Sequence, residues 1–278
     1  MAIVYRPLIL QEALHLRSCE NAQVVAGGTD WMLRRARSSP GKQPVLYVGG
    51  LKELQGIVLR GDTLCIGAAC TLTDLLLSPL LPDCLKQPLA QMASPAIRNV
   101  ATIGGNVCNA SPAADAVPML YALDAVLRLQ SEGGGETVPV QDFILAPGRT
   151  RLKEGQLLTQ IHIPLQRAWR CTYRKVGMRR ANSLSKLSFY ALTDRSAGGL
   201  TDVRITFGAV APVVVRSREM EQEILSGNQP LSKDQMQRII TQYDKLLRPI
   251  DDARSNQVYR REISLRLLKQ FLAEEINK

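Results

Sequence analysis

The spacing of apolar and polar positions changes along the chain, and these changes predict its elements. Short runs with alternating apolar side chains predict strands over residues 22–26, 44–48, 63–69, 125–130 and 157–163. Helical spacing predicts helices over residues 8–18, 30–37, 82–93 and 116–123, with a further helix capped by Thr71. Gly133-Gly134-Gly135 predicts a hairpin turn that returns through residues 136–140.

The last third of the chain has a different pattern. Residues 171–176, 187–192 and 203–210 are typical of strands in an antiparallel sheet. Ser232 to Gln235 matches a capping box, and apolar residues at helical spacing follow it over 236–247 and again over 263–272. We therefore expect an α+β fold with two domains. The first covers residues 1–168, with subdomains of about 1–55 and 56–168, and the smaller second domain covers residues 169–278.

Two turns with adjacent glycines are the candidate ligand-binding features. The first follows a predicted strand and precedes a predicted helix, and comprises Val25, Ala26, Gly27, Gly28, Thr29 and Asp30. The second comprises Thr102, Ile103, Gly104, Gly105 and Asn106, with Asn109, Ser111 and Asp115 close behind it. Backbone N–H groups in such turns can converge on an anion. Two turns predict adjacent anionic groups, most simply a pyrophosphate, although helix capping and a polar surface loop are the alternatives.

Charge and composition narrow the function classes. The 278 residues carry a net charge of +10, which would suit a nucleic-acid-binding protein. However, aromatic residues are only 5% of the chain and no basic run is interleaved with aromatic residues, which argues against nucleic-acid binding. From Gly155 to Thr193 there is no acidic residue, and this segment holds seven cations: Arg167, Arg170, Arg174, Lys175, Arg179, Arg180 and Lys186. It is either a solvated face or a surface for an anionic cofactor or acidic partner.

Cysteine and histidine usage bears on metals and location. Six cysteines without Cys-x-x-Cys spacing and two distant histidines predict no metal site in this chain. No apolar run reaches eighteen residues, so no membrane span is expected. Reduced thiols and the absence of a secretion signal predict a cytoplasmic protein.

Taken in order, the motifs resemble one family. Ala-Gly-Gly-Thr-Asp (26–30), Ile-Arg-Asn-x-Ala-Thr-Ile-Gly-Gly-Asn (97–106) and Ala-Ser-Pro-Ala-Ala-Asp (110–115) resemble the FAD-binding medium subunits of molybdenum hydroxylases. Xanthine, carbon monoxide and nicotinate dehydrogenases belong to that family. Residues 155–164, 173–180 and 207–212 extend the resemblance over nearly the whole chain. It implies a two-part PCMH-type FAD-binding domain followed by an antiparallel sheet with helices.

The resemblance also implies roles for individual residues. The first turn would wrap the FAD pyrophosphate through backbone N–H groups, and Thr102 to Asn106 would hold its other side. Ser111 and Asp115 would bond the polar chain of FAD, and Leu157 or Leu158 would lie against the flavin ring. Lys175 would approach a flavin carbonyl oxygen and tune the ring. Met178 interrupts the family's basic motif, which leaves the contacts of Arg179 and Arg180 open.

The function implied is that of an electron-transfer subunit of a xanthine dehydrogenase-like oxidoreductase. A large subunit would hydroxylate the substrate at a molybdenum cofactor, and a small subunit would pass electrons through [2Fe-2S] clusters to FAD and then to an acceptor such as NAD. The absence of a cysteine-rich insertion argues against the hydroxybenzoyl-CoA branch. A self-contained FAD-dependent oxidase or reductase of the same fold and a nucleic-acid-binding or scaffold protein are the alternatives.

Overall fold

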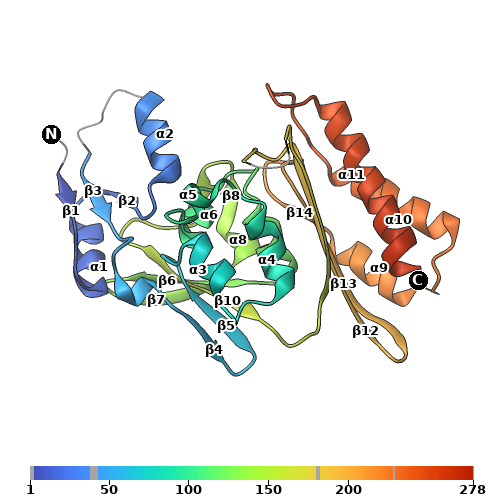
Figure 1. Cartoon of the computed structure of the whole chain (residues 1–278), viewed down its shortest axis with the longest axis horizontal. Coiled ribbons are helices and arrows are strands. Elements are labelled where there is room, and N and C mark those ends of the chain that lie inside the picture. Colours follow the sequence, from blue (N-terminus) through green and yellow to red (C-terminus); the bar gives the residue numbers. More distant parts are fainter. Residues whose placement is uncertain (1–2, 38–42, 180–181, 228, 278) are drawn as a thin grey trace. The chain divides into compact units, whose positions relative to one another are not determined.

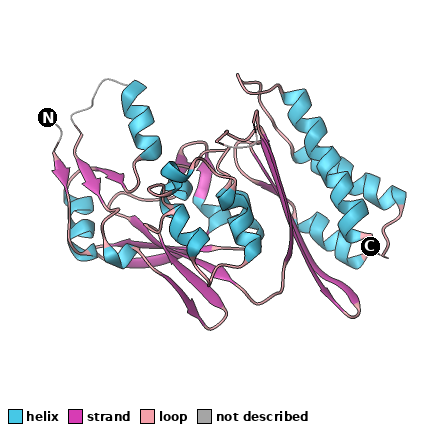
Figure 2. Ribbon diagram, in the orientation of Figure 1, coloured by secondary structure: helices cyan, strands magenta, loops and turns pink. Residues whose placement is uncertain are grey.

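The computed structural model describes residues 3–37, 43–179, 182–227 and 229–277 (Figures 1 and 2). The chain forms two compact units, and each gathers several segments of the sequence. Unit 1 contains Met1–Pro82, Ala93–Ser111 and Asp124–Gln166, and unit 2 contains Asp83–Met92, Pro112–Leu123 and Arg167–Lys278. The division predicted at residue 168 did not include the two short segments that join unit 2 from the first half of the chain.

Unit 1 begins with a three-stranded parallel sheet. Its order is β1 (Val4–Tyr5), β3 (Val45–Tyr47) and β2 (Gln23–Val25). Helix α1 (Leu10–Cys19) packs on it because Leu14 shares an apolar core with Leu46 and Leu157. Helix α2 (Thr29–Arg37) follows β2 directly.

The second sheet of unit 1 is antiparallel. Its order is β4 (Ile57–Arg60), β5 (Thr63–Gly67), β10 (Leu157–Pro164), β6 (Val126–Ser131) and β7 (Gly134–Pro139). The predicted hairpin is confirmed, but its turn is at Glu132 and Gly133, earlier than expected. The remaining elements of the unit are short: η1 (Lys52–Leu54), α3 (Leu72–Leu77), α5 (Pro95–Arg98), α6 (Ile103–Cys108), α8 (Val140–Phe143), β8 (Ile144–Ala146) and β9 (Arg149–Thr150).

Unit 2 is built on a four-stranded antiparallel sheet, as the alternating pattern predicts. The strands are β11 (Arg170–Val176), β12 (Leu187–Ser196), β13 (Gly199–Gly208) and β14 (Val215–Arg216), in that order. Helices α9 (Arg218–Ser226), α10 (Lys233–Leu246) and α11 (Gln257–Phe271), with the π-helical turn η2 (Leu272–Ile276), lie on one face of the sheet (Figure 2). The core between them contains Phe189, Phe207, Tyr243 and Phe271.

The two segments contributed by the first half of the chain are also helical. They are α4 (Asp83–Ala90) and α7 (Ala116–Ala122), and both pack on the sheet of unit 2. Tyr190 donates from its hydroxyl to the carbonyl of Cys84 at 3.2 Å, and Thr206 donates to the carbonyl of Pro118 at 3.0 Å. Side chains in the middle of the sheet thus fix both helices. None of the described helices is long and apolar enough to span a bilayer.

Candidate functional site

The first glycine turn lies against the backbone that leads into the second. A Cβ added to Gly27 would be 1.8 Å from the carbonyl oxygen of Val100, so no other residue fits there without moving the backbone. Gly28 has φ +71°, a conformation that glycine adopts without steric strain. Two motifs about seventy residues apart are therefore in contact in unit 1, as a shared ligand would require.

The first turn offers hydrogen-bond donors. Helix α2 begins at Thr29, and its amide of Met32 donates to the carbonyl of Gly28 at 2.9 Å. The amides of Gly27, Gly28, Thr29 and Asp30 make no hydrogen bond with any other described residue. Unpaired N–H groups and the positive end of the helix dipole favour an anion at this point.

The second turn uses its amides within the protein. The four amides from Ile103 to Asn106 donate, in order, to the carbonyl of Cys70 (3.0 Å), the carbonyl of Ala68 (2.9 Å), and the hydroxyl (3.1 Å) and carbonyl (3.0 Å) of Thr102. A Cβ at Gly104 would lie 2.5 Å from the carbonyl oxygen of Ala68. These four amides are therefore not free for a ligand, in contrast to the expectation that both turns would donate through the backbone.

A buried polar atom of the second turn lacks a partner within the described residues. The side-chain oxygen of Asn106 is buried and has no hydrogen-bond partner among the described residues. Buried polar atoms nearly always have a partner, so an unpartnered one points to a group that binds there. Because Asn106 Oδ1 is an acceptor, the missing partner is a donor such as a hydroxyl or an N–H group.

Arg34 connects the two motifs, and sequence reasoning missed it. Its guanidinium donates to the side-chain oxygen of Asn109, and its Nε lies 3.0 Å from the carboxylate of Asp30. Arg34 thus places a positive charge one helical turn beyond the unpaired amides. The signal was present in the sequence, because an arginine four residues after Asp30 lies on the same face of a helix.

The other predicted residues of unit 1 are less distinctive. Leu157 and Leu158 open β10, and both side chains are buried, at 2% and 6% exposure. Neither leucine therefore offers an exposed side chain to a ring, and a contact with flavin through their backbone stays a prediction. Ser111 is half-buried.

Asp115 and Lys175 form a buried ion pair in unit 2. Lys175 Nζ lies 2.7 Å from Asp115 Oδ2, with side-chain exposures of only 6% and 8%, and it donates to the carbonyl of Gln91 at 3.0 Å. The hydroxyl of Ser185 donates to the other carboxylate oxygen of Asp115. Burial raises the pKa of Asp115, and the nearby ammonium of Lys175 opposes that rise.

The ion pair has neighbours that sequence reasoning did not find. Ser185 and Gln91 carry no local signal, because they reach Asp115 and Lys175 only through the fold. Tyr173 lies two residues before Lys175 on the same side of β11, and its buried hydroxyl has no partner among the described residues. Burial and the negative charge of Asp115 raise the pKa of Tyr173, so its hydroxyl stays protonated.

Three cations of the basic segment, Arg167, Arg170 and Lys175, pair with acids from elsewhere in unit 2. Arg167 lies 3.0 Å from Asp194, and Arg170 lies 3.1 Å from Glu275. Arg179 donates to the carbonyl of Asn182 at 2.6 Å, whereas Arg180 lies outside the described residues. The acids that pair with the two arginines come from β12 and η2, so the segment is less electropositive than its own composition predicts.

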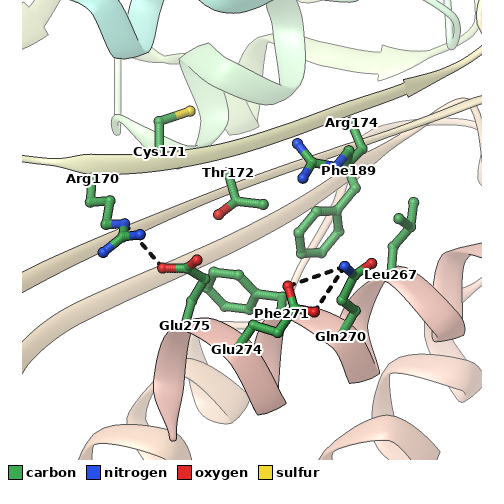
Figure 3. A pocket seen from close by; sticks show the side chains of 10 residues that line it. All are labelled: Arg170, Cys171, Thr172, Arg174, Phe189, Leu267, Gln270, Phe271, Glu274 and Glu275. Atoms are coloured by element: carbon green, nitrogen blue, oxygen red, sulfur yellow. Dashed lines mark hydrogen bonds and ion pairs between the residues drawn. The ribbon is translucent and has the colours of Figure 1, made fainter. Parts of the chain in front are cut away.

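Unit 2 also contains a small polar pocket between β11 and the α11–η2 helix (Figure 3). Its volume is about 150 Å³. The Arg170–Glu275 ion pair crosses one end, and Gln270 bonds Glu274 at 3.1 Å. Its charged side chains thus already have partners within the protein, and it is not the site suggested by the glycine turns.

Comparisons with known proteins match both halves of the chain. The family model described as the FAD binding domain in molybdopterin dehydrogenase matches residues 1–166. The model described as the CO dehydrogenase flavoprotein C-terminal domain matches residues 172–275.

Curated relatives and solved structures agree with these matches. The xanthine dehydrogenase FAD-binding subunit of Escherichia coli O157:H7 is 29% identical, over 99% of this chain and 96% of that protein. The glyceraldehyde dehydrogenase medium chain of Sulfolobus acidocaldarius is 30% identical, over 91% of each. Carbon monoxide dehydrogenase from Hydrogenophaga pseudoflava shares the fold, with a TM-score of 0.89 at 24% identity over 97% of this chain and 95% of that chain. The resemblance drawn from the motifs is confirmed: the chain belongs to the family of FAD-binding subunits of molybdenum hydroxylases, which serve oxidoreductase complexes.

Proposed function

We propose that the first glycine turn binds the diphosphate of FAD and that the second turn supports it. The observation that carries this proposal is the set of unpaired amides at the start of α2, held against Val100 by the packing of Gly27. Backbone N–H groups at a helix N-terminus bind phosphate in many nucleotide sites. When bound, FAD supplies the redox chemistry through its ring.

The residues of unit 1 fit this cofactor on three counts. The amides of the first turn donate to phosphate oxygens, and Arg34 adds positive charge within one helical turn. Asn106 Oδ1 accepts from a hydroxyl of the cofactor, which satisfies its missing hydrogen bond. Gly27 keeps the first turn against Val100, which leads into the second turn, whereas Gly104 packs on Ala68. The second turn thus contributes shape and one side chain, while the first contributes most donors.

Asp115, Ser111 and Lys175 keep the roles that the resemblance implies, as part of the proposal. The structure supports one refinement for Lys175, since its ammonium is fixed by Asp115 and by the carbonyl of Gln91. A cation that is already held in position stabilises negative charge that develops nearby. No free energy is then spent on reorienting the lysine side chain during the reaction. We therefore propose Lys175 as the residue that tunes the flavin, with Asp115 holding it in place.

We further propose a place for this subunit in a larger complex. A large subunit with a molybdenum cofactor oxidises the substrate, a small subunit with [2Fe-2S] clusters delivers the electrons here, and NAD is the acceptor. The support is that relatives are named as medium chains or FAD-binding subunits of dehydrogenases. A cytoplasmic location is part of the same proposal, because the six cysteines form no disulfide and the cytosol keeps thiols reduced.

Two neighbouring arginines on α2 give a matched test of the FAD site. Arg34 is directed to Asp30 and Asn109, whereas Arg35 stacks on the ring of Trp31 at 5.0 Å. A hydrogen bond to a charged group contributes about 1.5–3 kcal/mol, so Arg34→Gln should raise the Kd for FAD about tenfold or more. Arg35→Gln should leave that Kd unchanged.

The measurement is titration of apoprotein with FAD, followed by flavin fluorescence at two salt concentrations. Because Arg34 also bonds Asp30, an Asp30→Asn variant separates loss of the ion pair from loss of positive charge. Equal affinities for the Arg34→Gln and Arg35→Gln variants would reject the proposed diphosphate site. Substrate turnover by the purified chain alone would instead favour a self-contained oxidase or reductase. Molybdenum and iron in subunits that co-purify with the chain would support the proposed complex.

A further inference from the structure

At the C-terminal turn of α1, a thiol and an imidazole meet a carboxylate from another element. Cys19 Sγ lies 3.8 Å from His15 Nε2 and 3.9 Å from His15 Nδ1. His15 Nδ1 lies 3.0 Å from Glu132 Oε1, and Ser18 donates to Glu132 Oε2 at 2.7 Å. Glu132 comes from the turn between β6 and β7, so the fold, and not local sequence, completes the group.

The Glu132 carboxylate determines which nitrogen of the His15 ring carries the proton. The hydrogen bonds from Ser18 and His15 lower the pKa of Glu132, so this carboxylate is ionised at neutral pH. It accepts the proton on Nδ1, which leaves the lone pair of Nε2 free to take a proton from the thiol. A nucleophile next to a base, with the base oriented by a third group, is the arrangement that activates cysteine.

The other charged groups on α1 and at its C-terminal cap are directed elsewhere. Glu12 accepts from the amide of Leu8 at 2.9 Å. Arg17 donates to the carbonyls of Ala22 and Gln156, at 2.9 and 3.4 Å. Glu20 interacts with the hydroxyl of Tyr5, where burial and this carboxylate raise the pKa of the tyrosine. Glu132 is the charged group that contacts the His15 ring.

Cys19 differs from the other five cysteines in its surroundings. All six lie in the described residues, and Cys19 alone is exposed. Burial raises the pKa of Cys84 to about 11 and the pKa of Cys108 and Cys171 to about 12, which keeps these thiols protonated. Reactivity follows the thiolate and its accessibility, so the chain contains one thiol suited to reaction with a solute.

We propose that Cys19 is a modification site whose thiol, activated by His15, exchanges with low-molecular-weight disulfides. His15 Nε2 takes the proton of Cys19, and the thiolate attacks one sulfur of the disulfide. A new S–S bond forms to Cys19 as the original S–S bond breaks, and the departing thiolate takes the proton from His15. The products are a mixed disulfide on Cys19 and one free thiol, with no other oxidant needed.

The test uses the FAD-loaded complex as purified, with oxidised glutathione as the probe. Intact mass and peptide mapping give the site and the second-order rate between pH 6 and 9.5. We expect the label on Cys19, and none of that label in Cys19→Ser. Because His15 takes the proton as the thiol attacks, His15→Gln should slow the reaction about tenfold at pH 7. The two rates should converge above about pH 9, where an ordinary thiol ionises without help from a base.

Two further variants separate activation from general damage. His162→Gln changes the other histidine, which bonds Gln160, and should leave the rate unchanged. Glu132→Gln should slow the reaction at pH 7 in the same direction as His15→Gln. Circular dichroism and FAD content confirm that each variant is folded. Labelling of a different cysteine, no labelling, or equal rates for the wild type, His15→Gln and Glu132→Gln at pH 7 would overturn the proposal.

Discussion

Replacing Lys175 by methionine would leave Asp115 buried with Ser185 as its remaining side-chain donor. Methionine keeps much of the length of lysine but removes its charge and its N–H groups. Breaking a buried ion pair by removing one partner costs about 3–5 kcal/mol. A change of 1 kcal/mol moves the melting temperature by about 2–4 °C in proteins of this size, so the apoprotein should melt about 6–20 °C lower at pH 7.

The pH dependence of this loss gives the stricter test. Burial raises the pKa of Asp115 in the folded protein, and removing Lys175 raises it further because the ammonium opposes the rise. A carboxyl whose folded pKa is raised stabilises the protein most below its unfolded pKa of about 3.9. That contribution is lost as the pH rises through the folded pKa. The deficit of Lys175→Met should therefore be smaller at pH 4.5 than at pH 7.

The assay is urea unfolding of the apoprotein at pH 4.5, 5.5 and 7, with a double variant as control. Lys175→Met combined with Asp115→Asn removes both charges, so it should recover most of the stability lost by the single variant at pH 7. A deficit that is equal at all three pH values would refute the reasoning. A double variant no more stable than the single one would do so too, because an unpaired buried carboxylate could not then be the cause.

Two further predictions concern packing and acid stability. Gly27→Ala should lower both FAD content and the melting temperature, since overpacking costs about 1–3 kcal/mol and the added Cβ meets the carbonyl of Val100 at 1.8 Å. Gly133→Ala, whose Cβ meets nothing within 4 Å, is the matched control and should change neither. At Asp252, burial acts to raise the pKa, but hydrogen bonds from two arginines, including Arg260, outweigh it and hold the pKa below the ordinary value. Ionised Asp252 therefore stabilises the folded protein above its unfolded pKa, and this contribution is lost as the pH falls through the folded pKa. The free energy of unfolding, measured as the pH is lowered, should show this loss in the wild type and not in Asp252→Asn.

Local patterns predicted most elements correctly, because these elements depend on nearby residues. The capping box at Ser232 is confirmed, with the Ser232 hydroxyl and the Gln235 side chain each accepting from the other's amide. Thr71 likewise caps α3. Strand β4 was not predicted, because Ile57, Val58 and Leu59 are consecutive apolar residues that show no alternation. In the structure both Val58 and Leu59 are exposed. The strand forms because it pairs along its length with β5.

Properties that depend on distant residues could not be predicted. The two segments that join unit 2 are ordinary amphipathic or apolar helices in sequence, and their place is decided by side chains such as Tyr190 and Thr206. The basic segment showed no acids in its own window, yet Asp194 and Glu275 pair with its arginines. Ser185 was missed for the same reason, since its hydrogen bond to Asp115 joins residues seventy positions apart.

The two glycine turns share a short motif but perform different tasks, and the difference follows from what precedes each helix. Before α6, the carbonyl groups of Cys70 and Ala68 accept hydrogen bonds from the amides of Ile103 and Gly104. The Thr102 hydroxyl accepts from the amide that follows, that of Gly105. Before α2, no described residue supplies such acceptors. Adjacent glycines in both turns permit close backbone approach, but only the first turn leaves its backbone N–H groups unpaired. Substitution at Gly104 should therefore act through its clash with Ala68, and lower stability equally with and without FAD. Changes to α2 charges such as Arg34 should instead act chiefly on FAD affinity.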